Sequence, residues 1–169
     1  MEIRHARPED LPAILSIYER ARAFMAATGN PRQWAANGWP PESLIREDIR
    51  CRKSYVCTAD DESVAAVFYF DMGTDIEPTY RIIEEGAWLD PGPYGVVHRI
   101  ASSGTVPGTG RFCLDWAYAQ AKHLRIDTHP DNRVMQRLLE RCGFRRTGII
   151  HVVEDNDPRL AYERTGVPL

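Results

Sequence analysis

The stretch HRIASSGTVPGTGRFCLDWA, residues 98–117, decides the fold. It begins as a β-rich run, breaks at Ser102 and Ser103, passes through three glycines and a proline, and resumes as a helical pattern. Glycine lets the backbone approach a ligand closely, and the first amides of a helix lack partners within the helix and bind phosphate well. The stretch therefore predicts a strand, a phosphate-binding loop and a helix.

Two common phosphate-binding motifs do not fit this loop. A Walker A loop needs GxxxxGK[ST], but here Thr109 stands five residues after Gly104 and no lysine follows. The dinucleotide fingerprint GxGxxG also fails, because Cys113 occupies the third glycine position after Gly108 and Gly110. What remains is a strand, then xxGxGR, then a helix.

The rest of the chain contains further helical and strand patterns. Apolar residues at helical spacing, or β-rich runs bounded by turn residues, mark each of them. The expected helices cover residues 11–24, 43–50, 110–122 and 132–142, and the expected strands cover residues 2–6, 54–59, 63–70, 96–101, 124–128, 145–153 and 160–164, with 80–83 as a further short strand.

This order predicts an α/β (α+β) fold with a mixed central sheet. The first half reads as an antiparallel meander and the second half alternates strands with helices, so we expect helices on both faces. With 169 residues and no internal repeat or linker, the chain is expected to form a single domain over residues 1–169.

The composition is that of a soluble globular protein, with 43% hydrophobic and 27% charged residues. No apolar run approaches the ~20 residues that span a bilayer, which predicts no membrane partner. The polar beginning MEIRHARPED shows no signal peptide, so we expect a cytoplasmic protein. A net charge of −3, with no basic run beyond a pair of arginines, predicts no nucleic-acid partner.

The cysteines and histidines predict no metal site. Cys51, Cys57, Cys113 and Cys142 show neither a CxxC pair nor metal-ligand spacing, and the histidines include no HExxH. We expect four reduced, buried thiols, because free cysteine is among the most buried residue types.

Two elements of the sequence resemble the GNAT superfamily of acyl-CoA-dependent N-acetyltransferases. The signature of that superfamily, [QR]xxGx[GA] between a strand and a helix, reads TVPGTG here, with Thr105 in the position that usually holds glutamine or arginine. NRVMQRLLERCGF, residues 132–144, resembles the second recurrent element of the superfamily. The resemblance extends over essentially the whole chain, although a bare GxG by itself marks only a turn.

The resemblance implies acetyl-CoA as co-substrate. It places the pyrophosphate on the amides of PGTGR and the pantetheine on the backbone of Ile100 and Ala101, while Asn132 either faces CoA or only caps its helix. The cofactor-binding residues that it implies are Ile100, Ala101, Val106, Gly108, Thr109, Gly110, Arg111 and Asn132.

The proton carriers depart from the pattern of the superfamily. Leu139 stands where many members have the tyrosine that protonates the thiolate, and PYGVVHR lacks the carboxylate that some members use as a base. The candidate catalytic residues are therefore Glu85 and His98. A solvated loop glutamate and a structural strand histidine are the alternatives.

Trp34 and Trp39 fall where the superfamily walls its acceptor side, so the resemblance implies substrate contact, with a role in the core as the alternative. Acidic residues before the central strand would favour a cationic amine if they line the cleft, with scattered surface carboxylates as the simpler alternative. They are Asp71, Asp75, Glu77, Glu84 and Glu85.

The sequence thus predicts an N-acetyltransferase that acetylates a primary amine of a small molecule or a peptide. The missing tyrosine leaves two rivals open, namely a non-catalytic acyl-CoA-binding or sensor domain, and an interaction domain without a CoA site. Dimers are common among proteins of the superfamily that the chain resembles, so the resemblance also implies a possible homodimer.

Overall fold

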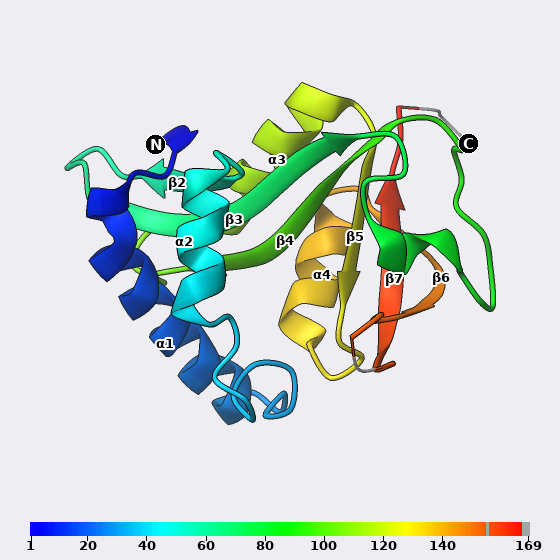
Figure 1. The fold of residues 1–169 in the computed structure, drawn as a ribbon, viewed down its shortest axis with the longest axis horizontal. Coiled ribbons are helices and arrows are strands. Elements are labelled where there is room, and N and C mark those ends of the chain that lie inside the picture. The colour runs from blue at the N-terminus through cyan, green and yellow to red at the C-terminus, as the bar shows by residue number, and fades with distance from the viewer. Residues whose placement is uncertain (155, 167–169) are drawn as a thin grey trace. The chain divides into compact units, whose positions relative to one another are not determined.

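The computed structural model describes residues 1–154 and 156–166. Figure 1 shows their helices and strands in chain order, from blue at the N-terminus to red at the C-terminus. The elements are β1 (Glu2–His5), η1 (Pro8–Asp10), α1 (Leu11–Ala27), α2 (Glu42–Arg50), β2 (Ser54–Thr58), β3 (Val64–Gly73), η2 (Pro78–Arg81), β4 (Tyr94–Ser102), α3 (Thr109–Ala121), β5 (Leu124–Thr128), α4 (Arg133–Arg141), β6 (Arg145–His151) and β7 (Pro158–Arg164), where η denotes a 3-10 helix.

The strands form a seven-stranded mixed sheet in the order β1-β2-β3-β4-β5-β7-β6. The pairs β1–β2 and β2–β3 are antiparallel, β4 pairs with β5 in parallel, and β7 is antiparallel to both β5 and β6. This confirms the predicted mixed sheet with its antiparallel N-terminal meander. The last strand lies between its two neighbours rather than at the edge of the sheet.

The chain divides into two compact units. Unit 1 contains Met1–Phe70 and His98–Cys113, and unit 2 contains Asp71–Val97 and Leu114–Leu169. The central strand β4 contributes its first half to unit 2 and its second half to unit 1.

The core of unit 1 lies between the sheet and the helices α1 and α2. Val56 of β2 and Val67 of β3 are paired in register and pack with apolar residues of both helices. Successive strand residues face opposite sides of a sheet. Accordingly, Cys57 faces away from α1 and α2 and its thiol contacts Cys113 in the first turns of α3. Helices therefore cover both faces of the sheet in unit 1, as predicted.

In unit 2, helix α4 has the two ends that its sequence predicts. The Asn132 Oδ1 accepts a hydrogen bond of 3.1 Å from the backbone N of Met135, which is an N-cap. Gly143 follows the helix with a φ of +80°, the left-handed conformation that commonly ends a helix. Between these ends, Leu139 is fully buried.

The short strand expected at residues 80–83 is wrong. Pro78 opens the 3-10 helix η2, and the carboxylate of Glu77 accepts from the backbone N of Thr79 at 3.1 Å, so the segment turns. Strand-like pairing begins only at Glu84, which forms an isolated antiparallel bridge with Ile149. Tyrosine and isoleucine gave this segment a strand composition, but the proline and the cap decide its structure.

The expectation of four buried thiols is wrong at one position. Cys57, Cys113 and Cys142 are buried, whereas Cys51 is exposed. Cys51 is the C-cap of α2, so it lies just beyond the helix whose face packs on the sheet.

Candidate active site

The central strand β4 is irregular at Arg99. This residue has a φ of +53°, in the left-handed region that residues other than glycine adopt only at a cost. Arg99 directly precedes Ile100 and Ala101, the residues whose backbone the family resemblance implies for the pantetheine. The parallel pairing of β4 with β5 comprises Gly95 with Leu124 and Val96 with Arg125.

Side chains from three other elements of unit 1 hold Arg99. Its guanidinium donates to the Oδ2 of Asp48 on α2 at 2.7 Å, and both side chains are largely buried. The same guanidinium lies 4.7 Å from the ring centroid of Tyr69 on β3. The hydroxyl of Tyr18 on α1 donates to the Arg99 carbonyl at 2.9 Å.

Burial raises the pKa of the Asp48 carboxyl, against the opposing effects of the Arg99 and His98 charges. His98 precedes Arg99 on β4, is half-buried, and has its ring centroid 5.8 Å from that of Tyr69. Asp48, His98 and Arg99 thus form one electrostatic group within unit 1.

Glu85, the other candidate catalytic residue, belongs to unit 2 and is exposed. It has a φ of +54° and follows Glu84, whose backbone N donates to the Ile149 carbonyl at 2.8 Å. The structure therefore places Glu85 at a turn beside β6, and the catalytic roles of Glu85 and His98 stay predictions.

The glycine loop enters α3 as the sequence predicts, with the helix beginning at Thr109 rather than Gly110. Gly108 has a φ of +79°, and a Cβ built on it would meet nothing within 4 Å, so the backbone conformation rather than crowding favours glycine here. The first helical bond runs from Phe112 N to the Gly108 carbonyl at 3.0 Å. The amides of residues 109–111 therefore precede the intrahelical ladder, which is the arrangement that binds anions.

The loop is also braced by its own residues. Thr109 is buried, and its hydroxyl donates to the Val106 carbonyl at 2.6 Å. Arg111, in the first turn of α3, is exposed and adds a positive charge to that helix end. These residues fit a pyrophosphate group.

A cavity of ≈ 590 Å³ adjoins the loop on the side of the β2–β3 turn. Its lining includes the carboxylates of Asp60 and Asp61, which disfavour an anionic ligand. The helix start is therefore the better phosphate site. The full lining is Met1, Ala59, Asp60, Asp61, Ser63, Thr105 and Val106.

Three of the remaining predicted site residues have structural roles in the fold, namely Asn132, Ala101 and Trp34, and their binding roles stay predictions. Asn132 caps α4, and Ala101 belongs to the core cluster of unit 1. Trp34 is buried with its ring 5.8 Å from that of Tyr18, edge to face, whereas Trp39 is 37% exposed. The core alternative thus describes Trp34, and Trp39 keeps an accessible ring.

Sequence reasoning missed Asp48. The signal was present, because Asp48 lies on the same face of its helix as Ile45 and Ile49, both of which are buried. A carboxylate within an apolar stripe needs a buried partner, and Arg99 supplies it.

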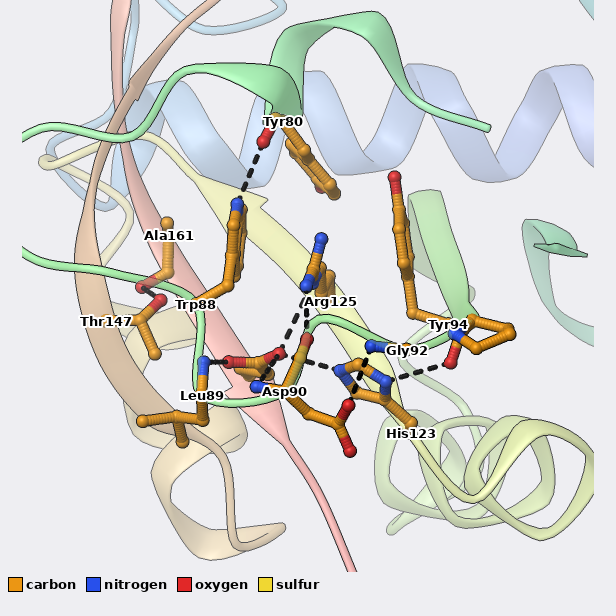
Figure 2. A network of polar contacts seen from close by, with 12 residues as sticks. Tyr80, Trp88, Leu89, Asp90, Gly92, Tyr94, His123, Arg125, Thr147 and Ala161 are labelled. Atoms are coloured by element: carbon orange, nitrogen blue, oxygen red, sulfur yellow. Dashed lines mark hydrogen bonds and ion pairs between the residues drawn. The ribbon is translucent and has the colours of Figure 1, made fainter. Parts of the chain in front are cut away.

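Sequence reasoning also missed a buried charge cluster in unit 2, which Figure 2 shows. Glu163 of β7 is 0% exposed and accepts from His123 Nε2 at 2.6 Å, from Arg125 Nε at 3.2 Å, and from the backbone N of Leu89. Burial alone would raise the pKa of Glu163, but these donors outweigh burial and lower that pKa.

The guanidinium of Arg125 lies between the rings of Trp88 and Tyr94, at 4.5 and 4.2 Å from their centroids (Figure 2). It also donates to the Asp90 carbonyl at 2.5 Å, and His123 Nδ1 lies 2.9 Å from the Pro93 carbonyl. The cluster fastens residues 88–94, which we call the strap, to β5 and β7. Because its polar atoms bond one another, it is a structural element.

Neither a metal centre nor a membrane span is found in the described part of the chain. Residues 1–154 and 156–166 contain no group of three or more histidine, cysteine or acidic side chains that could hold a metal ion. No helix among them has both the length and the apolar character needed to cross a membrane.

Comparisons with known proteins agree with this fold. The family model described as "Acetyltransferase (GNAT) domain" matches residues 1–145. A GNAT family acetyltransferase from Streptococcus agalactiae is 31% identical, with a TM-score of 0.87 over 99% of this chain and 96% of that one.

More distant structures share the fold. A GNAT family acetyltransferase from Listeria monocytogenes is 16% identical, with a TM-score of 0.69 over 96% of this chain and 93% of that one. A ribosomal-protein-alanine N-acetyltransferase from Brucella melitensis is 15% identical, with a TM-score of 0.63 over 98% and 99%. A search of curated protein sequences finds no match.

The mixed sheet, the loop that enters α3 and these likenesses define the protein as an acyltransferase. The chain belongs to the GNAT acetyltransferase family. Enzymes of this family generally use acetyl-CoA.

Proposed function

We propose that this acetyltransferase uses acetyl-CoA to acetylate a primary amine of a small molecule or a peptide. The observation that carries the proposal is the start of α3, where a left-handed Gly108 delivers the amides of residues 109–111 ahead of the first helical bond. The strand β4 that leads into this loop carries its irregularity at Arg99, next to the residues assigned to pantetheine.

The binding roles follow from the chemistry of the cofactor. Acetyl-CoA supplies an activated acetyl thioester and a pyrophosphate. We assign the pyrophosphate to the amides of residues 109–111 and to the charge of Arg111, with Gly108 setting the turn and Thr109 bracing Val106. We assign the pantetheine to the backbone of Ile100 and Ala101. A contact of Asn132 with CoA is also proposed, in addition to its observed capping of α4.

Proton transfer requires a base for the acceptor, because an ammonium group cannot attack until it loses its proton. His98 and Glu85 are the proposed candidates, and the half-buried His98 is the one on β4. Leu139 is fully buried, so its position offers no acid for the departing thiolate. A thiol of pKa ~8.5 leaves as its anion near neutral pH with little help.

The buried Leu139 also favours a second candidate function, a CoA-binding domain without turnover. Product formation separates the two. We would incubate the protein with acetyl-CoA and a panel of amines, amino acids and peptides, and follow thiol release and product mass. The proposal predicts acetylated product for at least one amine, whereas CoA binding without any product supports the second candidate.

The cofactor site is tested by comparing two glycines of the same loop. Gly104 and Gly108 both have positive φ, of +76° and +79°, and both have open space where a Cβ would stand. Valine therefore strains the backbone equally at either position. CoA should raise the unfolding midpoint of wild type and of Gly104→Val, and should not raise that of Gly108→Val. An equal CoA shift in both variants would move the pyrophosphate away from the start of α3.

The base is tested by His98→Gln and Glu85→Gln, once an acceptor has been found. Loss of the base should lower turnover by about 10²-fold while CoA affinity is unchanged. The variant that loses the limb of the pH profile below neutrality identifies the base. Full turnover and an unchanged profile in both variants would mean that the acceptor loses its proton to water.

A further inference from the structure

The backbone conformation of Arg99 needs an explanation. A residue other than glycine with a φ of +53° is strained, and this conformation persists only where the surroundings determine it. Arg99 lies within a strand, not at a turn. Contacts within unit 1 must therefore hold the backbone of Arg99 in this conformation.

Three contacts meet at this residue, and they come from α1, α2 and β3. Tyr18 fixes the carbonyl of Arg99 at 2.9 Å, and the ring of Tyr69 lies against the guanidinium. Asp48 holds the end of the side chain at 2.7 Å. The main chain and the side chain of Arg99 are thus anchored in two directions, which fixes the torsions between them.

The contact with Asp48 is the critical one of the three. Arg99 Nε is buried and makes no hydrogen bond within the described chain. The guanidinium is therefore incompletely satisfied and depends on Asp48 for its counter-charge. Without that carboxylate, a charged group would remain in a largely buried place and would tend to move toward water.

We propose that Asp48 is a positioning residue for acetyl-CoA. By holding Arg99, it keeps β4 in the left-handed conformation that aims the backbone of Ile100 and Ala101 at the pantetheine. Rotation about the φ and ψ angles of Arg99 changes the direction of the Ile100 amide. The ion pair therefore sets the orientation of the Ile100 amide, whose nitrogen is two bonds from the Arg99 Cα. This inference rests on the function proposed above and names a residue that acts through another.

The alternative role for Asp48 is that of the base itself. The carboxylate is already engaged by Arg99 at 2.7 Å, and its side chain is 12% exposed, which argues for positioning. The charged and titratable groups that interact with it are Arg99 and His98 of β4, Glu47 of its own helix and Tyr18 of α1. The two roles predict different results when Asp48 is removed: a positioning role can be replaced by a residue that adopts positive φ at position 99, whereas the role of a base cannot.

The experiment compares two double variants that differ by a single Cβ. Asp48→Ala/Arg99→Gly and Asp48→Ala/Arg99→Ala both remove the ion pair together with its buried charge. Glycine adopts positive φ at no steric cost, whereas alanine does not. We expect the glycine variant to have a kcat/KM for acetyl-CoA about 10-fold higher than the alanine variant, with a matching difference in CoA affinity.

Two single variants complete the series. Asp48→Ala should lose at least about 10-fold in kcat/KM for acetyl-CoA while keeping the limb of the pH profile below neutrality, although the position of that limb can shift because Asp48 and His98 interact. Tyr18→Phe, which removes the hydrogen bond to the Arg99 carbonyl, should show the same kind of loss, of smaller size. Circular dichroism and the unfolding midpoint verify that each variant is folded.

Equal kinetics of the two double variants, in a protein that binds CoA, would overturn the inference. Loss of the limb of the pH profile below neutrality in Asp48→Ala, without rescue by glycine, would do the same and would make Asp48 the base. If wild type itself binds no CoA, the proposed function fails first and this inference falls with it. The wild-type binding measurement therefore tells the two failures apart.

Discussion

Each unit contains a buried arginine paired with a carboxylate, and the two pairs differ in how completely they are satisfied. In unit 2, Arg125 bonds Glu163 and the Asp90 carbonyl and lies between the rings of Trp88 and Tyr94. In unit 1, Arg99 bonds Asp48 and has one aromatic neighbour, and its Nε makes no hydrogen bond within the described residues.

The carboxylates of the two pairs, Asp48 and Glu163, also differ in the direction in which their pKa values are shifted. Burial raises the pKa of Asp48, whereas the donors around Glu163 lower its pKa in spite of burial. A fully bonded ion pair stabilises the structure around it, and an incompletely bonded pair persists where it serves another purpose. We therefore interpret the Glu163 cluster as a lock on the strap and the Asp48 pair as a control of the backbone of β4.

The largest expected effect is the loss of the unit 2 lock. Glu163→Gln should lower the free energy of unfolding by about 3–5 kcal/mol, because it leaves Arg125 buried without its counter-charge. Chemical denaturation measures the loss. Asp75→Asn is the matched control, because it breaks the exposed pair with Arg81 and should leave the midpoint unchanged. A small loss for Glu163→Gln would show that the two clusters are alike.

The next effect concerns the segment that leads into the strap. A Cβ on Gly86 would lie 1.9 Å from the Thr147 carbonyl oxygen, a backbone atom of β6 that cannot move cheaply. Gly86→Ala should therefore cost about 1–3 kcal/mol of unfolding free energy. At Gly92 the Cβ would lie 3.0 Å from an Asp90 side-chain atom, so Gly92→Ala should cost distinctly less. Equal losses at the two positions would contradict close packing of Gly86 on β6.

Two tyrosine hydroxyls compare the units more finely. Tyr80→Phe removes a 2.7 Å bond to the Asp127 carboxylate in unit 2 and should cost about 2 kcal/mol. Tyr18→Phe removes a 2.9 Å bond to the neutral Arg99 carbonyl in unit 1 and should cost about 1 kcal/mol. Urea unfolding of both variants, with wild type alongside, measures the order. The reverse order would mean that the hold on Arg99 contributes more to stability than to alignment.

The smallest effect is a difference in pH dependence. Because the folded-state pKa of Glu163 is lowered, its contribution is present above the unfolded pKa of about 4.3 and is lost as pH falls through the folded value. The penalty of Glu163→Gln should therefore shrink on acidification. Because the pKa of Asp48 is raised, its contribution is present below the unfolded pKa of about 3.9 and is lost as pH rises through the folded value.

Asp48→Asn should accordingly gain stability relative to wild type as pH rises through that range, opposite in sign to Glu163→Gln. Unfolding free energies between pH 3 and pH 7 provide the measurement. Parallel pH dependence of the two penalties would remove the electrostatic distinction between the clusters.

Local features of the sequence predicted most of the fold. Helical spacing, caps and turn residues specify α3, α4 and the glycine loop, because each depends on neighbours within a few residues. The position of β7 between β5 and β6 depends instead on contacts between distant segments, which periodicity does not encode. The prediction of a strand at residues 80–83 failed because the composition of that segment favours a strand, whereas Pro78 begins a turn.

The candidate site was likewise predictable where it depends on neighbouring residues, and not where it depends on residues far apart in the sequence. The residues around Gly108 form one continuous stretch, so a motif identified them. Asp48 and Arg99 are 51 residues apart, and their pairing depends on how α2 packs on the sheet. Glu163 follows the apolar run of residues 160–162 in β7, and its partners His123, Arg125 and Leu89 lie 38 to 74 residues away in the sequence.

The interior position of β7 has a consequence for biosynthesis. The ribosome delivers β5 and the strap well before β7, because Glu163 lies 40 residues after His123 and 74 residues after Leu89. Until β7 emerges, β5 has an unpaired edge and Arg125 lacks its carboxylate partner. An exposed strand edge of this kind makes a nascent chain prone to aggregation. Closing contacts of such long sequence separation is slow. A chain stalled before residue 158 should therefore need a chaperone that covers a strand edge, and completion of β7 should release it.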